Sequence, residues 1–365
     1  MKLFFDARFT RTDRHDGISR YGSCLLAALL EVTRGTEIEV IAIIHDEAQL
    51  ALLPDTPYVV LNHPMSPAEL TIAKRLDALG ADVVFSTMQV MGSWGRDHAL
   101  VLTLHDLIYY AHPQPPADLP AVVRGAWRLY HRAYWPQRLM LDRADAVAVV
   151  SRTTARLVAE HALTSRPVHV VPNAVAPPPE LPARAPGHDA RSLVYMGAFL
   201  PYKNVEALIR ALAHLPGWTL HLPSRITPAR ERELRALVPD RARVVFHRGA
   251  SDEEYAALLD SATALVTASL DEGFGLPVVE AMARGVPVAV SELPIFRELA
   301  DGVAEFFDPH DPADIAHAVS ALSVPEVWAA RAQAAQVRAA EFSWESSAEV
   351  LLDLARSLHA ERTRR

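Results

Sequence analysis

Short apolar runs alternate with longer amphipathic stretches along most of the chain, and this alternation restricts the fold more than any other feature. The amphipathic stretches have the length and period of helices, and the apolar runs have the length of buried strands. Because strands separated by helices pair in parallel, the chain is predicted to be α/β, with helices on both faces of parallel sheets. Strands are expected near 2–6, 38–44, 57–61, 82–86, 99–104, 145–150, 168–171, 192–197, 218–222, 243–247, 263–268 and 287–290, and helices near 18–32, 66–79, 118–141 and 152–162.

A proline-rich stretch at residues 172–190 interrupts the alternation. Its proline density prevents regular structure and stiffens the chain, which is typical of a linker. A length of 365 residues is compatible with two domains or with one large domain, and the linker favours two. We therefore predict a first Rossmann-like domain at 1–171, the linker at 172–190 and a second such domain at 191–340.

Residues 341–365 form a separate C-terminal segment, whose pattern predicts one strongly amphipathic helix. One side of this helix is apolar, and a helix with such a side buries it against another element. The apolar residues on that side are Trp344, Val350, Leu351, Leu354 and Leu358.

Composition excludes several classes of protein. The formal charge of −8 and the isoelectric point near 6.1 argue against nucleic acid as a partner. A single cysteine, Cys24, excludes an internal disulfide and a cysteine-based metal cluster. The apolar run at residues 1–6 is too short for a signal peptide, and no stretch has 18 uninterrupted apolar residues. We expect a soluble, cytoplasmic protein.

Residues 269–287 carry the most specific chemical pattern in the chain. A buried strand near 262–268 precedes a polar turn with two glycines, and Pro277 then suits the first position of a helix that Gly285 ends. Free backbone N–H groups at such a turn favour a phosphate or sugar hydroxyls. Two carboxylates, Glu272 in the turn and Glu280 in the first helical turn, flank this site. The alternative is structural, since glutamates at helix starts and glycines in turns are common.

The combination resembles a known signature. Two glutamates separated by seven residues, with Gly-Phe-Gly-Leu-Pro between them, are similar to the donor-sugar motif of the retaining nucleotide-sugar glycosyltransferases of family four, which have the GT-B fold. This resemblance implies two Rossmann-like domains that face each other across a cleft, with the C-terminal helix crossing back to the first domain. It also implies that Glu280 binds the ribose, and that the donor sugar is held by Glu272, Gly273, Phe274, Gly275 and Leu276.

A second turn carries the phosphate-binding residues that the resemblance implies. Gly197 permits a tight turn after a strand, and Lys203 lies at the predicted start of the next helix. A lysine there is unfavourable unless an anion lies beside it, which makes Lys203 a candidate ligand of the diphosphate. The alternative is a solvated surface lysine. Family members carry an arginine where this chain has Ala198 or Tyr202, so Arg225 is the candidate to replace it.

Two residues of the first domain complete the candidate site. His105 follows a strand, at the end where ligands bind in parallel sheets. By resemblance, His105 contacts the donor sugar near its reacting carbon, and Gly17 offers its amide to the donor phosphate. No Gly-x-Gly-x-x-Gly motif follows the first strand, which argues against a dinucleotide-dependent dehydrogenase.

Arginines alternate with aromatic residues over 124–143. A basic, aromatic helix of this kind can lie on anionic lipid, which would make the protein peripheral at the inner face of a membrane. The alternative is a domain helix with aromatic core contacts and solvated arginines. The pattern leaves both open.

The resemblance implies transfer of a sugar from a nucleoside diphosphate to a saccharide or lipid-linked acceptor, with retained configuration. Residues 16–21 open the first long helix, and family members with a similar sequence there often resemble mannosyltransferases of polysaccharide biosynthesis. This similarity suggests GDP-mannose as the donor. His105, Glu272 and Lys203 are the expected catalytic residues, and neither a metal nor a cofactor is expected. Two alternatives remain: a nucleotide-sugar epimerase or hydrolase, and a catalytically silent sugar-nucleotide-binding partner.

Overall fold

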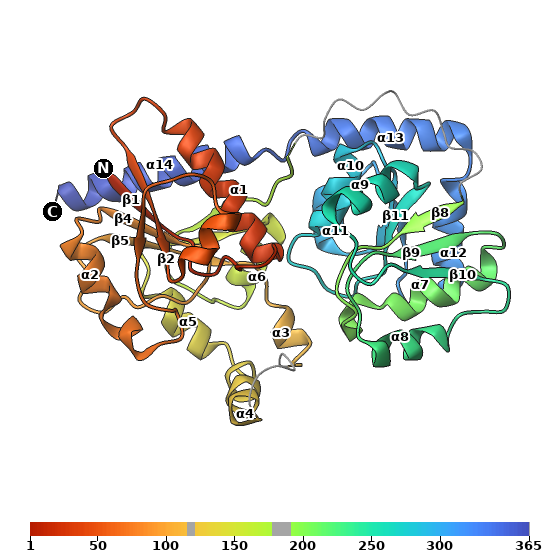
Figure 1. Ribbon diagram of the computed structural model, residues 1–365, viewed down its shortest axis with the longest axis horizontal. Coiled ribbons are helices and arrows are strands. Elements are labelled where there is room, and N and C mark those ends of the chain that lie inside the picture. The colour runs from red at the N-terminus through yellow and green to blue at the C-terminus, as the bar shows by residue number, and fades with distance from the viewer. Residues whose placement is uncertain (115–120, 177–190, 365) are drawn as a thin grey trace. The chain divides into compact units, whose positions relative to one another are not determined.

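Two parallel sheets with helices on their faces form the protein, which confirms the predicted α/β class (Figure 1). The structure, a computed structural model, describes residues 1–114, 121–176 and 191–364, without the side chains of 121 and 122. Unit 1 comprises Met1–Ala174 and Ser343–Arg365, and unit 2 comprises Val175–Phe342. The predicted linker at 172–190 lies outside the described residues from 177 on.

Unit 1 contains a seven-stranded sheet whose order is β3-β2-β1-β4-β5-β6-β7. Each strand pairs in parallel with its neighbours, and the central strands are buried on both faces, as expected when helices cover both sides. The strands are β1 (Lys2–Asp6), β2 (Glu39–Ile44), β3 (Tyr58–Val60), β4 (Val83–Ser86), β5 (Ala99–Leu104), β6 (Ala146–Val149) and β7 (Val168–Val170).

The helices of unit 1 are α1 (Gly17–Val32), η1 (Glu47–Leu52), η2 (Pro67–Thr71), α2 (Ile72–Ala78), α3 (Ile108–Ala111), α4 (Ala121–Tyr130), α5 (Trp135–Leu141), α6 (Arg152–Glu160) and α14 (Trp344–Thr363). Those predicted near 18–32 and 152–162 are present, but the one predicted at 66–79 is divided into η2 and α2, and η1 and α3 were not predicted. The single helix predicted at 118–141 is wrong: the described part is two helices, α4 and α5, and 118–120 lie outside it. Pro136 explains the break, because its ring is tolerated in the first turn of α5 but not inside a continuous helix.

The C-terminal helix α14 packs on α1 within unit 1 (Figure 1). The indole of Trp344 lies 5.8 Å from the ring of Tyr21, centroid to centroid, and the hydroxyl of Ser347 donates to the carbonyl of Pro172 at 2.9 Å. Leu351 and Leu354 are buried as predicted, but Val350 is 40% exposed. The buried face of α14 also contains the small residues Ser347, Ala348 and Ala355. Small side chains at such positions let two helices approach closely.

Unit 2 contains a six-stranded parallel sheet whose order is β10-β9-β8-β11-β12-β13. Its strands are β8 (Ser192–Val194), β9 (Thr219–Leu222), β10 (Arg243–Phe246), β11 (Ala264–Thr267), β12 (Val288–Ser291) and β13 (Glu305–Phe307), the last of which the sequence pattern did not predict. The helices are η3 (Pro201–Lys203), α7 (Val205–Ala211), η4 (Leu212–His214), α8 (Pro228–Arg235), α9 (Asp252–Ser261), α10 (Leu276–Ala283), α11 (Pro294–Ala300), α12 (Pro312–Ala321) and α13 (Pro325–Ala339).

Each sheet has one point at which the order of its strands reverses. In unit 1 the chain proceeds outward from β1 to β2 and β3 on one side, and from β4 to β7 on the other. In unit 2 it does the same from β8, with β9 and β10 on one side and β11 to β13 on the other. Ligands of open parallel sheets bind beyond the carboxyl ends of the strands at such a switch point.

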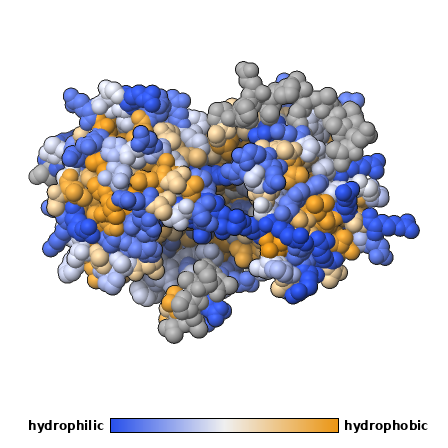
Figure 2. Space-filling model, viewed as in Figure 1, coloured by the Kyte–Doolittle hydropathy of each residue, from blue (hydrophilic) through white to orange (hydrophobic). Residues whose placement is uncertain are grey.

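Apolar side chains reach the surface of both units. In the view of Figure 2, orange patches interrupt the hydrophilic surface of each unit. The most exposed large apolar side chains of the described residues are Trp94, Met65, Leu70, Leu129, Val337 and Trp135, and all but Val337 belong to unit 1. No helix in the described part of the chain is both long enough and apolar enough to cross a bilayer.

The contact between α14 and α1 predicts unequal effects at two adjacent residues. Leu351→Ala should lower the free energy of unfolding of unit 1 by about 2–5 kcal/mol, because Leu351 is completely buried and the change leaves a cavity. Val350→Ala, at an exposed neighbour, should cost less than about 1 kcal/mol. Urea unfolding of both variants checks this, and equal losses would contradict the assigned face.

Candidate active site

The turn between β11 and α10 depends on a glycine. Gly275 is the N-cap of α10 and has a φ of +102°, in the left-handed region that favours glycine. A Cβ at Gly275 would also lie 2.8 Å from the ring of Phe296. Because Gly275 takes the cap position, Pro277 is the second helical residue rather than the first. Glu280 therefore lies in the second turn of α10, not in the first as predicted.

The side chain of Phe274 points into unit 2 rather than toward a ligand. Its ring is 5% exposed and meets the ring of Phe342 edge to face, with centroids 5.9 Å apart. Of Phe274, only the backbone is left as a candidate to bind a sugar hydroxyl. The aromatic residue of the motif therefore anchors the turn by packing.

Lys203 and Glu272 form an ion pair, although 69 residues separate them in the chain. Their side chains are only 15% and 14% exposed, so the pair is largely shielded from water. The hydroxyl of Ser269 donates to the same carboxylate oxygen at 3.0 Å, and Thr267 contacts Ser269 at 3.1 Å. Glu272 is thus held from two sides before any donor binds.

Lys203 ends the short helix η3 instead of starting the next long helix. Asn204 separates it from α7, with a φ of +50° and a side-chain amide that donates to the carbonyl of Pro309 at 2.8 Å. The centroid of the Tyr202 ring lies 5.2 Å from the ammonium of Lys203. The backbone carbonyl of Tyr202 accepts from the amide of Leu270 at 2.7 Å, which joins the two turns.

Gly197 lies in a turn that has no space for a side chain. A Cβ there would lie 2.7 Å from the hydroxyl of Tyr195, which donates to the carbonyl of Ala198 at 2.8 Å. The amide of Gly197 donates to the hydroxyl of Ser224 at 3.1 Å, and Ser224 directly precedes Arg225. The turns after β8 and β9 are therefore adjacent. Arg225 is exposed, and no described residue forms an ion pair or hydrogen bond with its side chain.

In unit 1, Gly17 is the first residue of α1, next to the N-cap Asp16. The carboxylate of Asp16 accepts from the amide of Ser19 at 2.9 Å. A Cβ at Gly17 would meet nothing within 4 Å, so no packing within the described chain requires this glycine. A requirement for glycine at this position would have to come from a ligand.

His105 follows β5, as predicted, and its ring is firmly held. Its Nε2 donates to the carbonyl of Thr87 at 2.8 Å, and its ring meets that of Tyr21 edge to face at 5.1 Å. Burial lowers the pKa of His105, although the Thr87 carbonyl and the carboxylates of Asp106 and Asp16 favour the protonated form. The ring is therefore neutral near pH 7, with its proton on Nε2.

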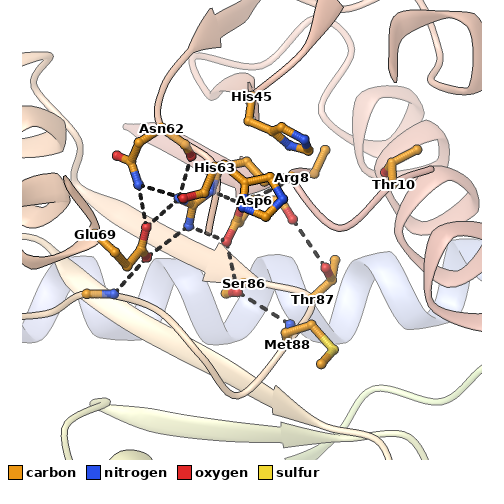
Figure 3. Close-up of polar contacts among 12 residues, drawn as sticks. Asp6, Arg8, Thr10, His45, Asn62, His63, Glu69, Ser86, Thr87 and Met88 are labelled. Atoms are coloured by element: carbon orange, nitrogen blue, oxygen red, sulfur yellow. Dashed lines mark hydrogen bonds and ion pairs between the residues drawn. The ribbon is translucent and has the colours of Figure 1, made fainter. Parts of the chain in front are cut away.

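A buried ion-pair cluster at the carboxyl end of β1 had no counterpart in the sequence predictions (Figure 3). Arg8 lies between the carboxylates of Asp6 and Glu69, and the side chains of Arg8 and Asp6 are completely buried. Burial alone would lower the pKa of Arg8, but the two carboxylates raise it above its usual value. The sequence does show Asp6 and Arg8 as two charged residues at the end of an apolar strand. That pattern was the one feature from which the cluster could have been predicted.

Sequence reasoning also missed the hydroxyls that support the predicted residues. The hydroxyls of Ser269 and Thr267 brace Glu272, those of Tyr195 and Ser224 hold the turn at Gly197, and that of Thr87 donates to the carbonyl of Asp6 beside the backbone that binds His105. Each lies within three residues of the carboxyl end of a strand, where polar side chains in a parallel sheet converge. Their position was predictable, but their partners were not.

Solved structures share this fold. Anabaena HepE, solved in complex with UDP and glucose, superimposes with a TM-score of 0.72 over 98% of this chain and 100% of its own, at 17% sequence identity. At this identity the likeness shows the fold alone, and that fold is GT-B, as predicted. Two parallel sheets with polar residues at their switch points thus define a protein of the GT-B class.

Family models identify the chain more closely. Residues 16–177 match the model described as "Glycosyltransferase Family 4", and residues 190–323 match "Glycosyl transferases group 1". The chain belongs to glycosyltransferase family 4, which confirms the predicted family.

Two curated relatives are mannosyltransferases. The serotype-specific mannosyltransferase WbdA of Escherichia coli is 31% identical over 163 residues, which are 42% of this chain but only 20% of WbdA. The GDP-mannose:cellobiosyl-diphosphopolyprenol alpha-mannosyltransferase of Xanthomonas campestris is 31% identical over 211 residues, 53% of this chain and 54% of that enzyme. The matches thus span about a fifth and about half of these relatives.

The packing of Gly275 predicts a larger cost of substitution than backbone strain alone. Gly275→Ala should destabilise unit 2 by more than about 2 kcal/mol, because the new Cβ adds a clash with Phe296 to the cost of a left-handed residue. Gly302→Ala is the matched control, since its φ is +76° but its Cβ would meet nothing within 4 Å. Chemical denaturation compares the two, and equal losses would show that the contact with Phe296 is relieved easily.

Proposed function

We propose that the chain transfers a sugar from a nucleoside-diphosphate sugar to an acceptor hydroxyl, with retention of the anomeric configuration. The observation that carries this proposal is the shielded Lys203–Glu272 pair at the switch point of unit 2. Lys203 supplies a positive charge and Glu272 a hydrogen-bond acceptor at one position. A diphosphate with an attached sugar needs both groups side by side.

The donor would be held along the turns after β8 and β11. Lys203 would bind the diphosphate, the turn at Gly197 would lie against it, and Arg225 is the second cation available to it. The sugar hydroxyls would bind to Glu272 and to backbone amides from Gly273 to Leu276, and the ribose to Glu280. Charge grows on the departing diphosphate, so Lys203 should act mainly in the transition state.

The reaction balances without a further reagent. The bond between the anomeric carbon and the β-phosphate oxygen breaks, and a bond from the acceptor oxygen forms on the same face of the sugar. The leaving phosphate oxygen takes the acceptor proton. Neither a metal nor a cofactor is part of the proposal. His105 would contact the sugar near its reacting carbon, and Gly17 would offer its amide to the phosphate.

For the donor we propose GDP-mannose, and for the acceptor a saccharide or lipid-linked saccharide of a polysaccharide pathway in the cytoplasm. The names of the two mannosyltransferase relatives support this choice. HepE, solved with UDP and glucose, makes a UDP-sugar the first competing donor to test.

Contact with a membrane surface is the second part of the proposal. Leu129, Trp135 and Leu139, on α4 and α5, are 68%, 66% and 54% exposed. Residues 124–143 contain five arginines and one acidic residue, although the whole chain has a net charge of −8. Exposed apolar side chains among arginines suit the interface of an anionic bilayer.

Two other functions make different predictions about products. An epimerase or hydrolase on the same fold would yield an isomerised or free sugar without an acceptor. A silent binding partner would bind the nucleotide sugar and yield nothing, and Ala198 and Tyr202 are the departures from the family pattern that favour it. Product analysis with GDP-mannose and an acceptor panel distinguishes these functions.

The donor proposal predicts selective thermal stabilisation. GDP-mannose should raise the unfolding temperature more than UDP- or ADP-sugars, because a ligand that binds only the folded state stabilises it by mass action. Glu280→Ala should lose most of this shift, since it removes a charged contact of roughly 1.5–3 kcal/mol. Lys203→Met should keep more of the shift, because Lys203 acts mainly in the transition state. Glu326→Ala, on an exposed part of α13, should retain it. If no nucleotide sugar stabilises the protein, the proposed function is wrong.

The membrane proposal predicts salt-sensitive binding to anionic vesicles. The protein should sediment with phosphatidylglycerol vesicles but not with phosphatidylcholine vesicles, and the bound fraction should fall as salt rises. Trp135→Ser with Leu139→Ser should weaken binding, whereas Val337→Ser, an exposed apolar position in unit 2, should not. Equal binding to both vesicle types would contradict an electrostatic contact.

A further inference from the structure

His105 is connected to the buried Asp6–Arg8 pair by a continuous series of hydrogen bonds. Its first link is the bond from His105 Nε2 to the carbonyl of Thr87. A carbonyl can only accept, so this bond requires the proton on Nε2 whenever the ring is neutral. The other ring nitrogen, Nδ1, then carries a lone pair and can only accept.

The backbone at Thr87 is fixed at several points. The hydroxyl of Thr87 donates to the carbonyl of Asp6 at 3.2 Å, and the hydroxyl of Ser86 donates to the carboxylate of Asp6 at 3.0 Å (Figure 3). Ser86 also accepts from the amide of Met88 at 3.3 Å, and its carbonyl accepts from the hydroxyl of Thr103 at 2.7 Å. These bonds leave the Thr87 carbonyl little freedom to turn away from His105.

Asp6 is in turn held by Arg8. The guanidinium donates to both carboxylate oxygens of Asp6, at 2.7 and 3.0 Å, and its remaining donors bind Glu69 and the carbonyl of Asn62. Glu69 also accepts from the amide of Gly92 at 2.9 Å, so the cluster ties the loops after β3 and β4 to the end of β1. Burying such a pair costs desolvation energy that apolar residues would avoid, which makes stability a poor explanation for it.

The cluster lies where unit 1 would bind a ligand. Asp6 and Ser86 are the last residues of β1 and β4, and they pair directly in the sheet. The strand order reverses between these two strands. This buried charge network lies at a switch point and is linked to a neutral histidine. Its position therefore suits a role in holding a site residue better than a role in stabilising the core.

We propose that Asp6, Arg8 and Thr87 are positioning residues that hold His105 as the Nε2–H tautomer, so that Nδ1 accepts a hydrogen bond from a hydroxyl of the sugar. This rests on the proposed function, in which His105 contacts the donor sugar. His105 then acts as a neutral acceptor rather than as an acid, because its proton stays committed to Thr87. Arg8 and Asp6 do not touch the substrate.

Thr87→Val tests the proposal with little change in shape. It keeps the branched side chain, whose methyl packs near Gly22, and deletes only the donor to Asp6. Thr33→Val is the matched control, because Thr33 is also buried and its hydroxyl donates to a backbone carbonyl, that of Leu29, at 2.7 Å. Ser86→Ala provides a second variant that loosens the same backbone, should Thr87→Val fold poorly.

Two measurements separate the outcomes. In the ¹⁵N spectrum of the whole protein, His105 should show a protonated Nε2 and an unprotonated Nδ1, and Thr87→Val and Ser86→Ala should each introduce the other tautomer. Glycosyl transfer should show a kcat about three- to tenfold lower in both, the scale of one net hydrogen bond, with KM for the donor little changed. Thr33→Val should change neither.

The spectrum needs no substrate, so it tests the positioning even if the proposed reaction is wrong. A mixed tautomer in the wild-type protein, or a pure Nε2–H tautomer in both Thr87→Val and Ser86→Ala, would overturn the positioning claim. A wild-type protein with the expected tautomer but no transfer with any donor would overturn the proposed function instead.

Discussion

The parallel pairing of β8 with β11, and of β1 with β4, is the constraint on which the candidate site depends. Parallel neighbours end at the same edge of a sheet, so turns far apart in the chain meet there. In unit 2 this joins the turn of Lys203 to that of Glu272, and the amide of Leu270 to the carbonyl of Tyr202. In unit 1 it joins Asp6 to Ser86. None of these contacts follows from local structure.

Both switch points carry a shielded ion pair, but the two pairs differ in what surrounds them. Arg8 is bound by two carboxylates and a carbonyl, so all the described contacts there are internal and the cluster is suited to support other groups. Lys203 is bound by one carboxylate, and an ammonium has three donors. A diphosphate can therefore join or displace Glu272 at Lys203. Arg8 is better suited to hold its neighbours in place.

Periodicity and single residues predicted a large part of this arrangement. The alternation of apolar and amphipathic runs predicted twelve of the strands, because burial on both faces makes parallel strands continuously apolar. The glycines at the two ends of α10 were recognisable in the sequence as turn and cap residues. The structure gives the reason: Gly275 and Gly285 have φ angles of +102° and +66°, where other residues are strained. The pattern did not predict the strand β13 or the exposure of Val350, since these depend on neighbours distant in the chain. It also missed the break between α4 and α5, which Pro136 marks in the sequence.

The sequence by itself determined the class of fold and the family, because these depend on period and spacing along the chain. Only the tertiary structure decided what each polar group contacts. Phe274 proved to be a packing residue, Lys203 the partner of Glu272, and His105 the partner of the Thr87 carbonyl. The reason is physical: a hydrogen bond or ion pair is set by distances of about 3 Å between atoms that the sheet, and not the sequence order, brings together.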